Sequence, residues 1–157
     1  MNVEIRTMTM EDVPAVAELD RISFALPWPE RSFRFEVRDN TASRCYVAIV
    51  DEHIVAALVA WLLVDELHVA TLATHPDFRR QGIAQKLLAH ALNLAVKEGA
   101  VSSFLEVRAS NLAAQAMYHK FGYEEVGRRR RYYKDNDEDA ILMTLEPLSV
   151  EGQISKV

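Results

Sequence analysis

Arg79-Arg80-Gln81-Gly82-Ile83-Ala84 is the stretch that decides the fold, because it joins a predicted strand to a strongly patterned helix. The strand is predicted over residues 67–74 and the helix over residues 83–98. Apolar residues in this helix follow the i, i+3, i+4, i+7 spacing of one buried face. They are Ala84, Leu87, Leu88, Ala91, Leu92 and Ala95. Gly99 stands where a left-handed C-terminal cap is expected.

The turn between this strand and this helix has the chemistry of an anion site. The first N–H groups of a helix have no intrahelical partner, and the helix dipole places partial positive charge there. Gly82 has no Cβ, so the backbone at that point can come close to a phosphate group. For the loop taken alone, the alternative is an ordinary strand-to-helix turn with a solvated basic rim.

Further motifs follow along the chain. Residues 105–111 read Leu-Glu-Val-Arg-Ala-Ser-Asn, and Ala116-Met117-Tyr118 and Phe121-Gly122-Tyr123 come next. Together with the pattern R-x-x-G-x-A, they resemble the acetyl-CoA motifs of the GNAT acetyltransferase superfamily over nearly the whole chain. The resemblance is closest to the ribosomal protein alanine N-acetyltransferase family. The segments that carry this closer match are Leu26-Pro27-Trp28, residues 105–111, Arg130-Arg131-Tyr132-Tyr133 and Glu138-Asp139-Ala140.

Composition limits the possible classes of protein. The chain has 157 residues, half of them apolar, which predicts one domain over residues 1–147 and a flexible tail over residues 148–157. A net charge of -5 argues against a general DNA- or RNA-binding surface. The single Cys45, expected to be buried, excludes an internal disulfide. The N-terminus lacks a signal-peptide pattern, and the apolar run 54–64 is too short to span a membrane, so we expect a cytoplasmic protein.

The predicted order of elements is β-α-α-β-β-β-α-β-α-β-β. Besides the strand and helix above, strands are expected at residues 3–6, 45–50, 54–64, 103–108, 123–133 and 140–145. Helices are expected from Thr9, which forms a capping-box-like start with Asp12, to about residue 24, from about residue 29, and from a cap at Asn111 to an end at Gly122. This order predicts an α/β fold with a mixed sheet and helices on both faces. The resemblance implies a GNAT-type, mostly antiparallel sheet of about seven strands that splay apart at the cofactor site.

The resemblance also implies how acetyl-CoA, the acetyl donor, is held. Leu72, Ala73 and Thr74 would offer backbone hydrogen bonds to the pantetheine arm, and Asn111 would contact the cofactor. The pyrophosphate would be held by Arg79, Arg80, Gln81, Gly82, Ile83, Ala84 and Gln85. Ala84 stands where many members of the family have Gly, a change that the pattern tolerates.

Glu106 is the main candidate for the catalytic base. An amine must be neutral when it attacks a thioester, and a carboxylate can take its proton directly or through water. The alternative for Glu106 is a structural ion pair with Arg108, two residues along on the same face of the strand. Asp65, Glu66 and His68 are rival bases, because other GNAT members place the base on the strand before the anion loop.

Tyr118 is the candidate acid that protonates the departing thiolate, a role that the resemblance assigns to this position. It follows Asn111 by seven residues, about 700° of helix rotation, so both side chains lie on nearly the same face. One ligand that runs along this helix could meet both. An aromatic core residue is the alternative for Tyr118.

The resemblance places the acceptor peptide between Leu26-Pro27-Trp28 and the pair Tyr132-Tyr133. The run Arg128–Arg131 alternates faces on a strand, so it is either a solvated sheet edge or a guide for an acidic or RNA-associated substrate. His53, His75, His90 and His119 have no spacing that predicts a metal site, and they are interpreted as surface residues.

Three functions follow from these observations. The first is a protein N-terminal acetyltransferase whose substrate is a ribosomal protein that begins with Ala. The second keeps acetyl-CoA but acts on a small amine such as a polyamine or aminoglycoside, and the third is a non-catalytic acyl-CoA-binding module. We expect no metal, no DNA binding and no membrane partner. The identity of the acceptor, the need for an auxiliary subunit and the oligomeric state are left open.

Overall fold

The helices and strands follow one another in the predicted order, and their bounds differ from the prediction by a few residues. The structure, a computed structural model, describes residues 1–149. In chain order the elements are β1 (Glu4–Thr7), α1 (Val13–Ser23), α2 (Glu30–Arg38), β2 (Ser43–Val50), β3 (His53–Leu63), β4 (Glu66–Thr74), α3 (Ile83–Lys97), β5 (Ser102–Arg108), α4 (Leu112–Phe121), β6 (Glu124–Tyr133) and β7 (Glu138–Leu145).

The strands form a seven-stranded sheet in the order β1-β2-β3-β4-β5-β7-β6. β4 and β5 are parallel, whereas the pairs β1/β2, β2/β3, β5/β7 and β6/β7 are antiparallel. The predicted mixed, mostly antiparallel sheet of about seven strands is therefore confirmed. Because β7 pairs with β5, β6 comes last in the described sheet and forms its edge.

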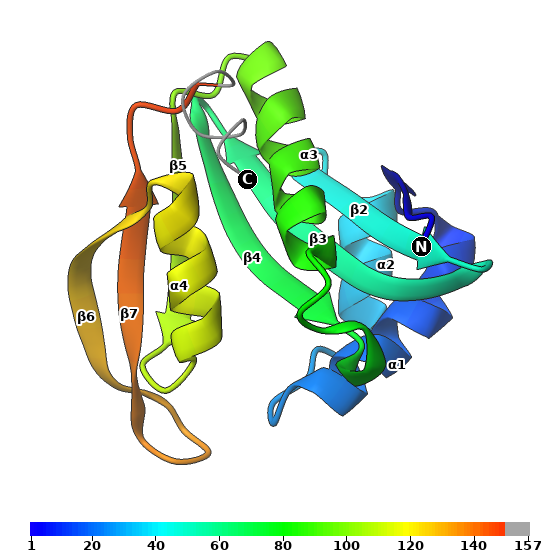
Figure 1. The fold of residues 1–157 in the computed structure, drawn as a ribbon, viewed down its shortest axis with the longest axis horizontal. Helices are drawn as coiled ribbons and strands as arrows, with labels where there is room; N and C mark the ends of the chain where they lie inside the picture. Colours follow the sequence, from blue (N-terminus) through cyan, green and yellow to red (C-terminus); the bar gives the residue numbers. More distant parts are fainter. Residues whose placement is uncertain (150–157) are drawn as a thin grey trace. The chain divides into compact units, whose positions relative to one another are not determined.

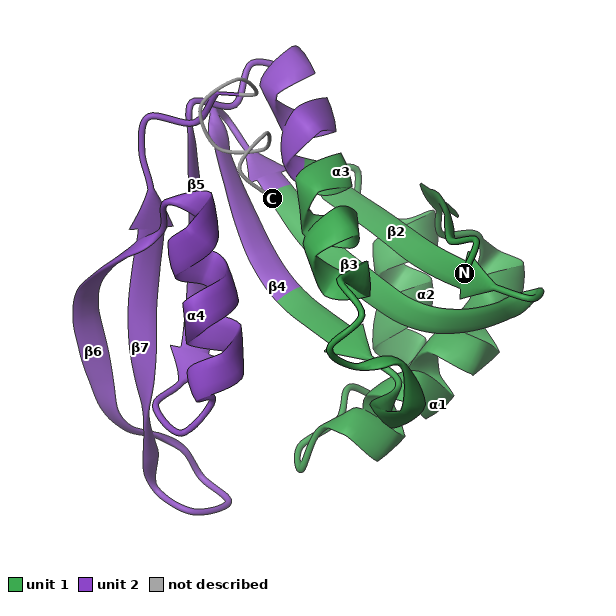
Figure 2. Cartoon of the chain, in the orientation of Figure 1, with its two compact units in different colours: residues 1–61, 71–91 green, residues 62–70, 92–157 purple. Residues whose placement is uncertain are grey.

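Two compact units divide the chain, and they interleave along the sequence (Figure 2). The first contains residues 1–61 and 71–91, and the second contains residues 62–70 and the chain from residue 92 onward. The boundaries fall inside β4, after Ala70, and inside α3, after Ala91.

In the first unit, α1 and α2 lie on one face of β2 and β3, and the first part of α3 lies on the other (Figure 1). Tyr46 of β2 and His90 of α3 make an edge-on ring contact, with centroids 4.9 Å apart. The predicted capping box is present, because the Thr9 N–H donates to Asp12 Oδ2 at 2.7 Å. Asp51 and Glu52 both have positive φ, as a two-residue hairpin between β2 and β3 requires.

In the second unit, α4 lies against one face of the strands β5, β7 and β6 (Figure 1). Asn111 caps its start and Gly122, with φ 106°, ends it, both as predicted. Tyr123 is fully buried, and its hydroxyl lies 2.7 Å from Ser103 Oγ, which donates to Leu67 O. These residues join the end of α4 to β5 and β4.

The end of the described chain lies in the segment predicted to be a tail. Leu148 is buried, and its N–H donates to Val101 O at 2.8 Å. Residues 150–157, the rest of the segment 148–157, lie outside the described residues.

Candidate functional site

The anion loop, which we define as residues 79–85, alternates between backbone conformations of opposite hand. The φ angle is -70° at Arg79, 63° at Arg80 and 79° at Gly82. The Arg79 backbone is extended, and the two positive φ angles that follow turn the chain sharply into α3. The first helical bond of α3 runs from Lys86 N–H to Gly82 O, so the N–H groups just before Lys86 have no acceptor within the helix. The backbone therefore offers several donors at one point.

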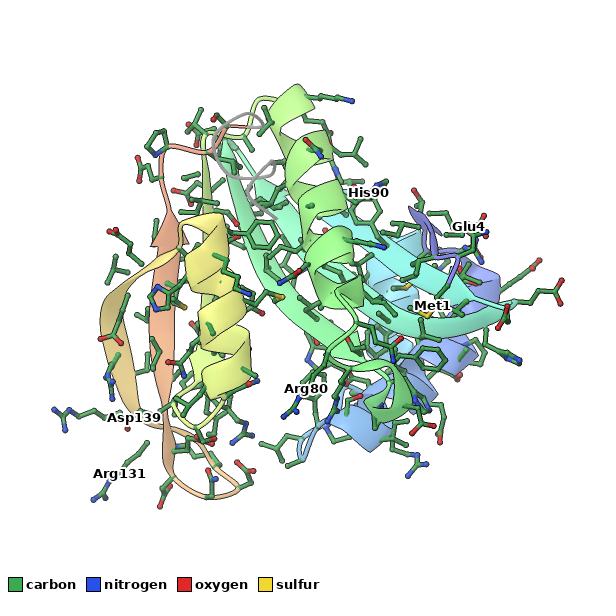
Figure 3. All side chains as sticks on the ribbon, viewed as in Figure 1. Met1, Glu4, Arg80, His90, Arg131 and Asp139 are labelled. Atoms are coloured by element: carbon green, nitrogen blue, oxygen red, sulfur yellow. The ribbon has the colours of Figure 1, made fainter. Side chains whose placement is uncertain are left out.

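Two side chains hold the anion loop in this form. Arg79 Nε donates to Thr74 O and Gln81 Nε2 donates to Asp77 O, both at 3.3 Å. Arg80 projects from the loop (Figure 3), is exposed, and forms no ion pair within residues 1–149. A Cβ built on Gly82 would meet Gln85 Oε1 at 3.8 Å, an ordinary contact. The positive φ, and not crowding by the protein, is what requires glycine there.

The three strand residues expected to hold the pantetheine arm lie at the end of β4. The parallel ladder between β4 and β5 joins Glu66–Val69 to Ser102–Leu105 and goes no further along either strand. Leu72, Ala73 and Thr74 come after this ladder, so their backbone groups on that side are not used by pairing with β5.

Leu26, Pro27 and Trp28 lie in the loop between α1 and α2. The Trp28 N–H donates to Asp20 Oδ2 at 2.7 Å, and it is the only backbone donor of residues 27–29 because both of its neighbours are prolines. Asp20 is only 3% exposed, and burial raises the pKa of its carboxyl group. The Trp28 ring packs on Phe33, with centroids 5.3 Å apart. Asp20 thus fixes the loop, a role that sequence reasoning missed.

A hollow of about 510 Å³ opens beside this loop, lined by residues 27–29 together with Phe35, Glu36 and Trp61 among others. Glu36 is buried and accepts hydrogen bonds from Trp61 Nε1 and Asn40 Nδ2, both at 2.9 Å. The predicted peptide loop therefore borders a mainly apolar concave surface.

Glu106, on β5, forms an ion pair with Arg129 of β6, with 3.1 Å between Oε1 and Nε. The alternative pairing with Arg108 is not found. The Arg129 guanidinium lies 5.7 Å from the ring centre of Tyr132, whose ring meets that of Tyr133 edge-on at 5.2 Å. The structure thus brings the candidate base together with the tyrosine pair assigned to the acceptor peptide.

Arg108 holds the tyrosine pair from the other side. Its guanidinium lies 4.0 Å above the Tyr133 ring and forms ion pairs of 3.1 Å with Asp135 and Glu138. Glu138 also accepts the Ser110 N–H at 2.6 Å, and the hydrogen bonds from Ser110 and Arg108 lower the pKa of Glu138 to about 2. These contacts tie the β6–β7 turn to the end of β5. Sequence reasoning considered Arg108 only as a partner of Glu106.

Tyr118, on α4, is buried, and its ring packs edge-on against Tyr123 at 5.6 Å. Its hydroxyl makes no hydrogen bond to any residue that the structure describes. Burial, with a smaller effect of Tyr133, raises the pKa of Tyr118 to about 12. At neutral pH the phenol therefore keeps its proton and can act as a donor.

Asn111 lies exposed at the start of α4. Its Oδ1 accepts the Ala114 N–H at 3.1 Å, which leaves Nδ2 without a partner in the described chain. Gln115, one turn along, donates to Arg108 O and Ala109 O, both at 3.0 Å, and so fixes α4 to the end of β5. Asn111 is first of all a helix cap, and its amide NH₂ group, with two N–H donors, is left for a ligand.

The rival bases lie level with β5 residues that precede Glu106. His68 Nε2 is 2.9 Å from Glu66 Oε1, and these residues pair with Phe104 and Ser102 of β5. At about 3.3 Å per residue they are about 7 and 13 Å along the strands from the level of Glu106. Asp65 precedes them, and its carbonyl accepts the Val101 N–H. Glu106, in contrast, is the first β5 residue after the ladder to β4 ends.

The run Arg128–Arg131 does not alternate regularly, which corrects the sequence prediction. The β6/β7 register shifts between Arg129 and Tyr133, and Arg131 adopts a φ of 51° while its N–H donates to Asp139 Oδ1. Arg131 points away from the strand pair (Figure 3). The run is exposed on the edge strand, as expected for a solvated sheet edge.

The remaining predictions concern Cys45, the histidines, metal sites and membrane spans. Cys45 is buried as predicted, and burial raises the pKa of its thiol to about 12. The surface interpretation of His90 is wrong, because this residue is half-buried against Tyr46 and burial lowers its pKa. Within residues 1–149 no cluster of three or more potential metal ligands is found. None of the helices in that range is both long and apolar enough to cross a bilayer.

The comparisons with known proteins agree on one family. The family model described as "Acetyltransferase (GNAT) family" matches residues 13–123. A ribosomal protein bS18-alanine N-acetyltransferase of Escherichia coli K12 is 33% identical over 148 residues, 93% of this chain and 98% of the relative. A Bacillus subtilis protein that carries this name provisionally is 35% identical over 139 residues, 88% of this chain and 92% of the relative.

The crystal structure of the Escherichia coli ribosomal-protein-S18-alanine N-acetyltransferase superposes with a TM-score of 0.87 at 31% identity, covering 94% of this chain and 96% of that one. The family model alone covers well over half of the chain, including the anion loop, Glu106 and Tyr118. The chain therefore belongs to the GNAT family of acetyltransferases, which use acetyl-CoA as the acetyl donor.

Proposed function

We propose that this chain transfers the acetyl group of acetyl-CoA to the N-terminal α-amine of a protein, and that the acceptor is a ribosomal protein that begins with Ala. The names of its relatives support this acceptor. The observation that carries the proposal is the Arg129 side chain, which pairs with Glu106 and lies 5.7 Å from the centre of the Tyr132 ring, and so links the candidate base to the tyrosines assigned to the peptide. We further propose that residues 1–147 act as one GNAT domain, and the acceptor implies a cytoplasmic enzyme.

The residues of the anion loop fit the pyrophosphate of acetyl-CoA. The N–H groups at the start of α3 and the exposed Arg80 supply hydrogen bonds and positive charge, and Gly82 supplies the backbone conformation. Residues 72–74 would bind the pantetheine arm through their backbone, and Asn111 through its free amide NH₂ group. Acetyl-CoA supplies a thioester that an amine can attack with release of a thiolate.

Glu106 takes the proton that the amine loses as its nitrogen forms the new bond to carbon. The transfer is direct or passes through one water. Tyr132 and Tyr133 orient the peptide at this carboxylate, and Arg108 and Glu138 hold the tyrosines in place. Leu26, Pro27 and Trp28 bind the peptide from the loop that Asp20 fixes.

Tyr118 stabilises the departing thiolate by donating a hydrogen bond to its sulfur. A pKa of about 12 lies about 3.5 units above that of an ordinary thiol, so full proton transfer would be uphill by on the order of 5 kcal/mol. A retained O–H···S hydrogen bond stabilises the negative charge without that cost. The Tyr118 hydroxyl, which has no hydrogen-bond partner among residues 1–149, is consistent with this role.

An α-amine suits this site better than a lysine side chain. The pKa of a peptide α-amine is about 7.7–8.0 and that of lysine about 10.4, a difference of about 3.5 kcal/mol in the free energy of deprotonation. A single carboxylate base such as Glu106 therefore has less free energy of deprotonation to supply when the acceptor is an α-amine.

The test is an acetylation assay read by mass spectrometry with purified protein and acetyl-CoA. The acceptors are short peptides with different free N-termini, the same peptides with blocked N-termini and an internal lysine, and several polyamines. Acetylation of free α-amines with a preference for Ala first is expected. Acetylation of polyamines or lysines alone would refute the proposal, and binding of acetyl-CoA without any turnover would favour a non-catalytic binding module.

A further inference from the structure

The Glu106 carboxylate already holds a cation that belongs to the chain itself. Arg129 Nε donates to Glu106 Oε1 at 3.1 Å, and no residue within the described range donates to Oε2. The Arg129 side chain is 56% exposed and that of Glu106 is 25% exposed. The ion pair is thus a single, solvent-accessible contact through Glu106 Oε1, and Oε2 has no hydrogen-bond donor among the described residues.

The sheet register explains why Arg129 reaches Glu106. Glu106 and Gly127 both pair with Leu142, whereas Arg129 pairs with Ala140, so these residues share one face of the β5-β7-β6 sheet. Two strand spacings and two residues separate Arg129 from Glu106, which puts their Cα atoms about 12 Å apart. Ala140, which pairs with Arg129, has a short side chain and leaves room on this face for the long arginine side chain to cross.

Glu106 and Tyr132 together have the chemistry of a receptor for a cation. The Arg129 guanidinium is bound by the carboxylate and lies 5.7 Å from the centre of the Tyr132 ring. A carboxylate and an aromatic face are the two groups that attract a positive charge in water-exposed sites. The acceptor assigned to this site reaches it mostly as an ammonium ion, because its α-amine is largely protonated at neutral pH.

We propose that Arg129 occupies the ammonium site of the acceptor in the free protein, and that the incoming α-ammonium group must displace it from Glu106. The proposal rests on the proposed function, since Glu106 is the residue assigned there to receive the amine. Arg129 is then an internal competitor. Exposed ion pairs of this kind are weak, so the acceptor can displace Arg129 and a substitution should have a modest effect.

The variant Arg129→Gln removes the competing charge and keeps a polar side chain at an exposed position. We expect it to lower the KM for an Ala-initiated peptide about two- to fivefold, which corresponds to about 0.4–1 kcal/mol, with kcat within twofold of the unaltered protein. Arg130→Gln is the matched control, because Arg130 is exposed on the same strand and forms no ion pair in the described chain. It should change neither constant.

Calorimetric titration with the same peptide, and with its N-acetylated copy, measures the effect without turnover. Arg129→Gln should bind the free-amine peptide two- to fivefold more tightly and the neutral copy unchanged. An equal or weaker affinity, or a kcat that falls more than tenfold, would overturn the proposal and make Arg129 a residue that positions Glu106. If the unaltered protein acetylates no α-amine, the proposed function fails, while the titration still decides whether Arg129 competes for the site.

Discussion

Replacing Asp20 tests how the peptide loop is held in place. The Asp20 carboxylate is buried and accepts the one backbone N–H group that residues 27–29 possess. Asp20→Ala removes this acceptor and leaves the Trp28 N–H without a partner. Asp20→Asn keeps an acceptor oxygen of similar size and removes the buried charge.

The structure sets the size of the effect. A hydrogen bond to a charged acceptor contributes about 1.5–3 kcal/mol, and its loss leaves a donor unpaired. For a chain of this length each kcal/mol corresponds to about 2–4 °C, so Asp20→Ala should lower Tm by roughly 3–12 °C. Asp20→Asn should stay within about 1 kcal/mol of the parent, because losing the stronger, charged hydrogen bond is offset by losing the cost of burying a charge.

The pH dependence of folding stability gives an independent test of Asp20. Burial raises the pKa of Asp20 above its ordinary value of 3.8, so the folded state binds the proton more tightly than the unfolded state. The stabilisation that comes from this tighter proton binding is fully present below about pH 4. It is lost as the pH rises through the pKa of Asp20 in the folded state. Asp20→Asn should remove this part of the pH dependence.

Thermal unfolding followed by circular dichroism between pH 4 and 8 measures both effects, and steady-state kinetics adds a functional readout. Asp20→Ala should raise the KM for the peptide and leave the KM for acetyl-CoA unchanged. If Asp20→Ala and Asp20→Asn have the same Tm and the same peptide KM, the hydrogen bond to Trp28 does not fix the loop and the reasoning is refuted.

Three further changes test other parts of the site. Tyr118→Phe should lower kcat more than tenfold while the Kd for acetyl-CoA, from calorimetry, stays within a few fold; unchanged turnover would remove Tyr118 from the mechanism. Gly82→Ala should lose about 1–2 kcal/mol of stability in urea denaturation, because a φ of 79° is strained for any residue with a Cβ. It should also raise the KM for acetyl-CoA, and an unaltered KM would argue against a phosphate at this loop. The lowered pKa of Glu138 adds stability above about pH 4.5 that is lost as the pH falls through about 2. Glu138→Gln should therefore make the stability depend less on pH in that range, and an unaltered acid unfolding transition would contradict the hydrogen bonds of Glu138 with Ser110 and Arg108.

Much of the fold could be predicted because its signals are local. The spacing of apolar residues along α3, the cap at Asn111 and the left-handed Gly122 each depend on a few neighbouring residues. The same holds for the hairpin between β2 and β3, whose turn at Asp51 and Glu52 falls where the apolar run is interrupted. One local reading was inexact, since Ala84 is half-buried and Ile83 occupies the buried position instead.

The partners of the site residues could not be predicted in this way. Glu106 meets Arg129 because β7 inserts between β5 and β6, and strand order is not encoded in any local pattern. Arg80 and Arg131 adopt positive φ although arginine has no preference for it, so no turn signal marked either position. Asp20 is a polar residue on a buried helix face, which resembles a surface position until its distant partner Trp28 is known.

The interleaving of the two units has a practical consequence for anyone who wishes to divide the protein. Because the first unit takes residues 1–61 and 71–91 and the second takes the rest, no single cut in the gene yields either one intact. A fragment that stops after Ala91 would carry an unfinished helix, and one that starts at Leu92 would lack the strand segment 62–70. Split-protein reporters should therefore place their break outside β4 and α3, so that the shared strand and helix stay whole.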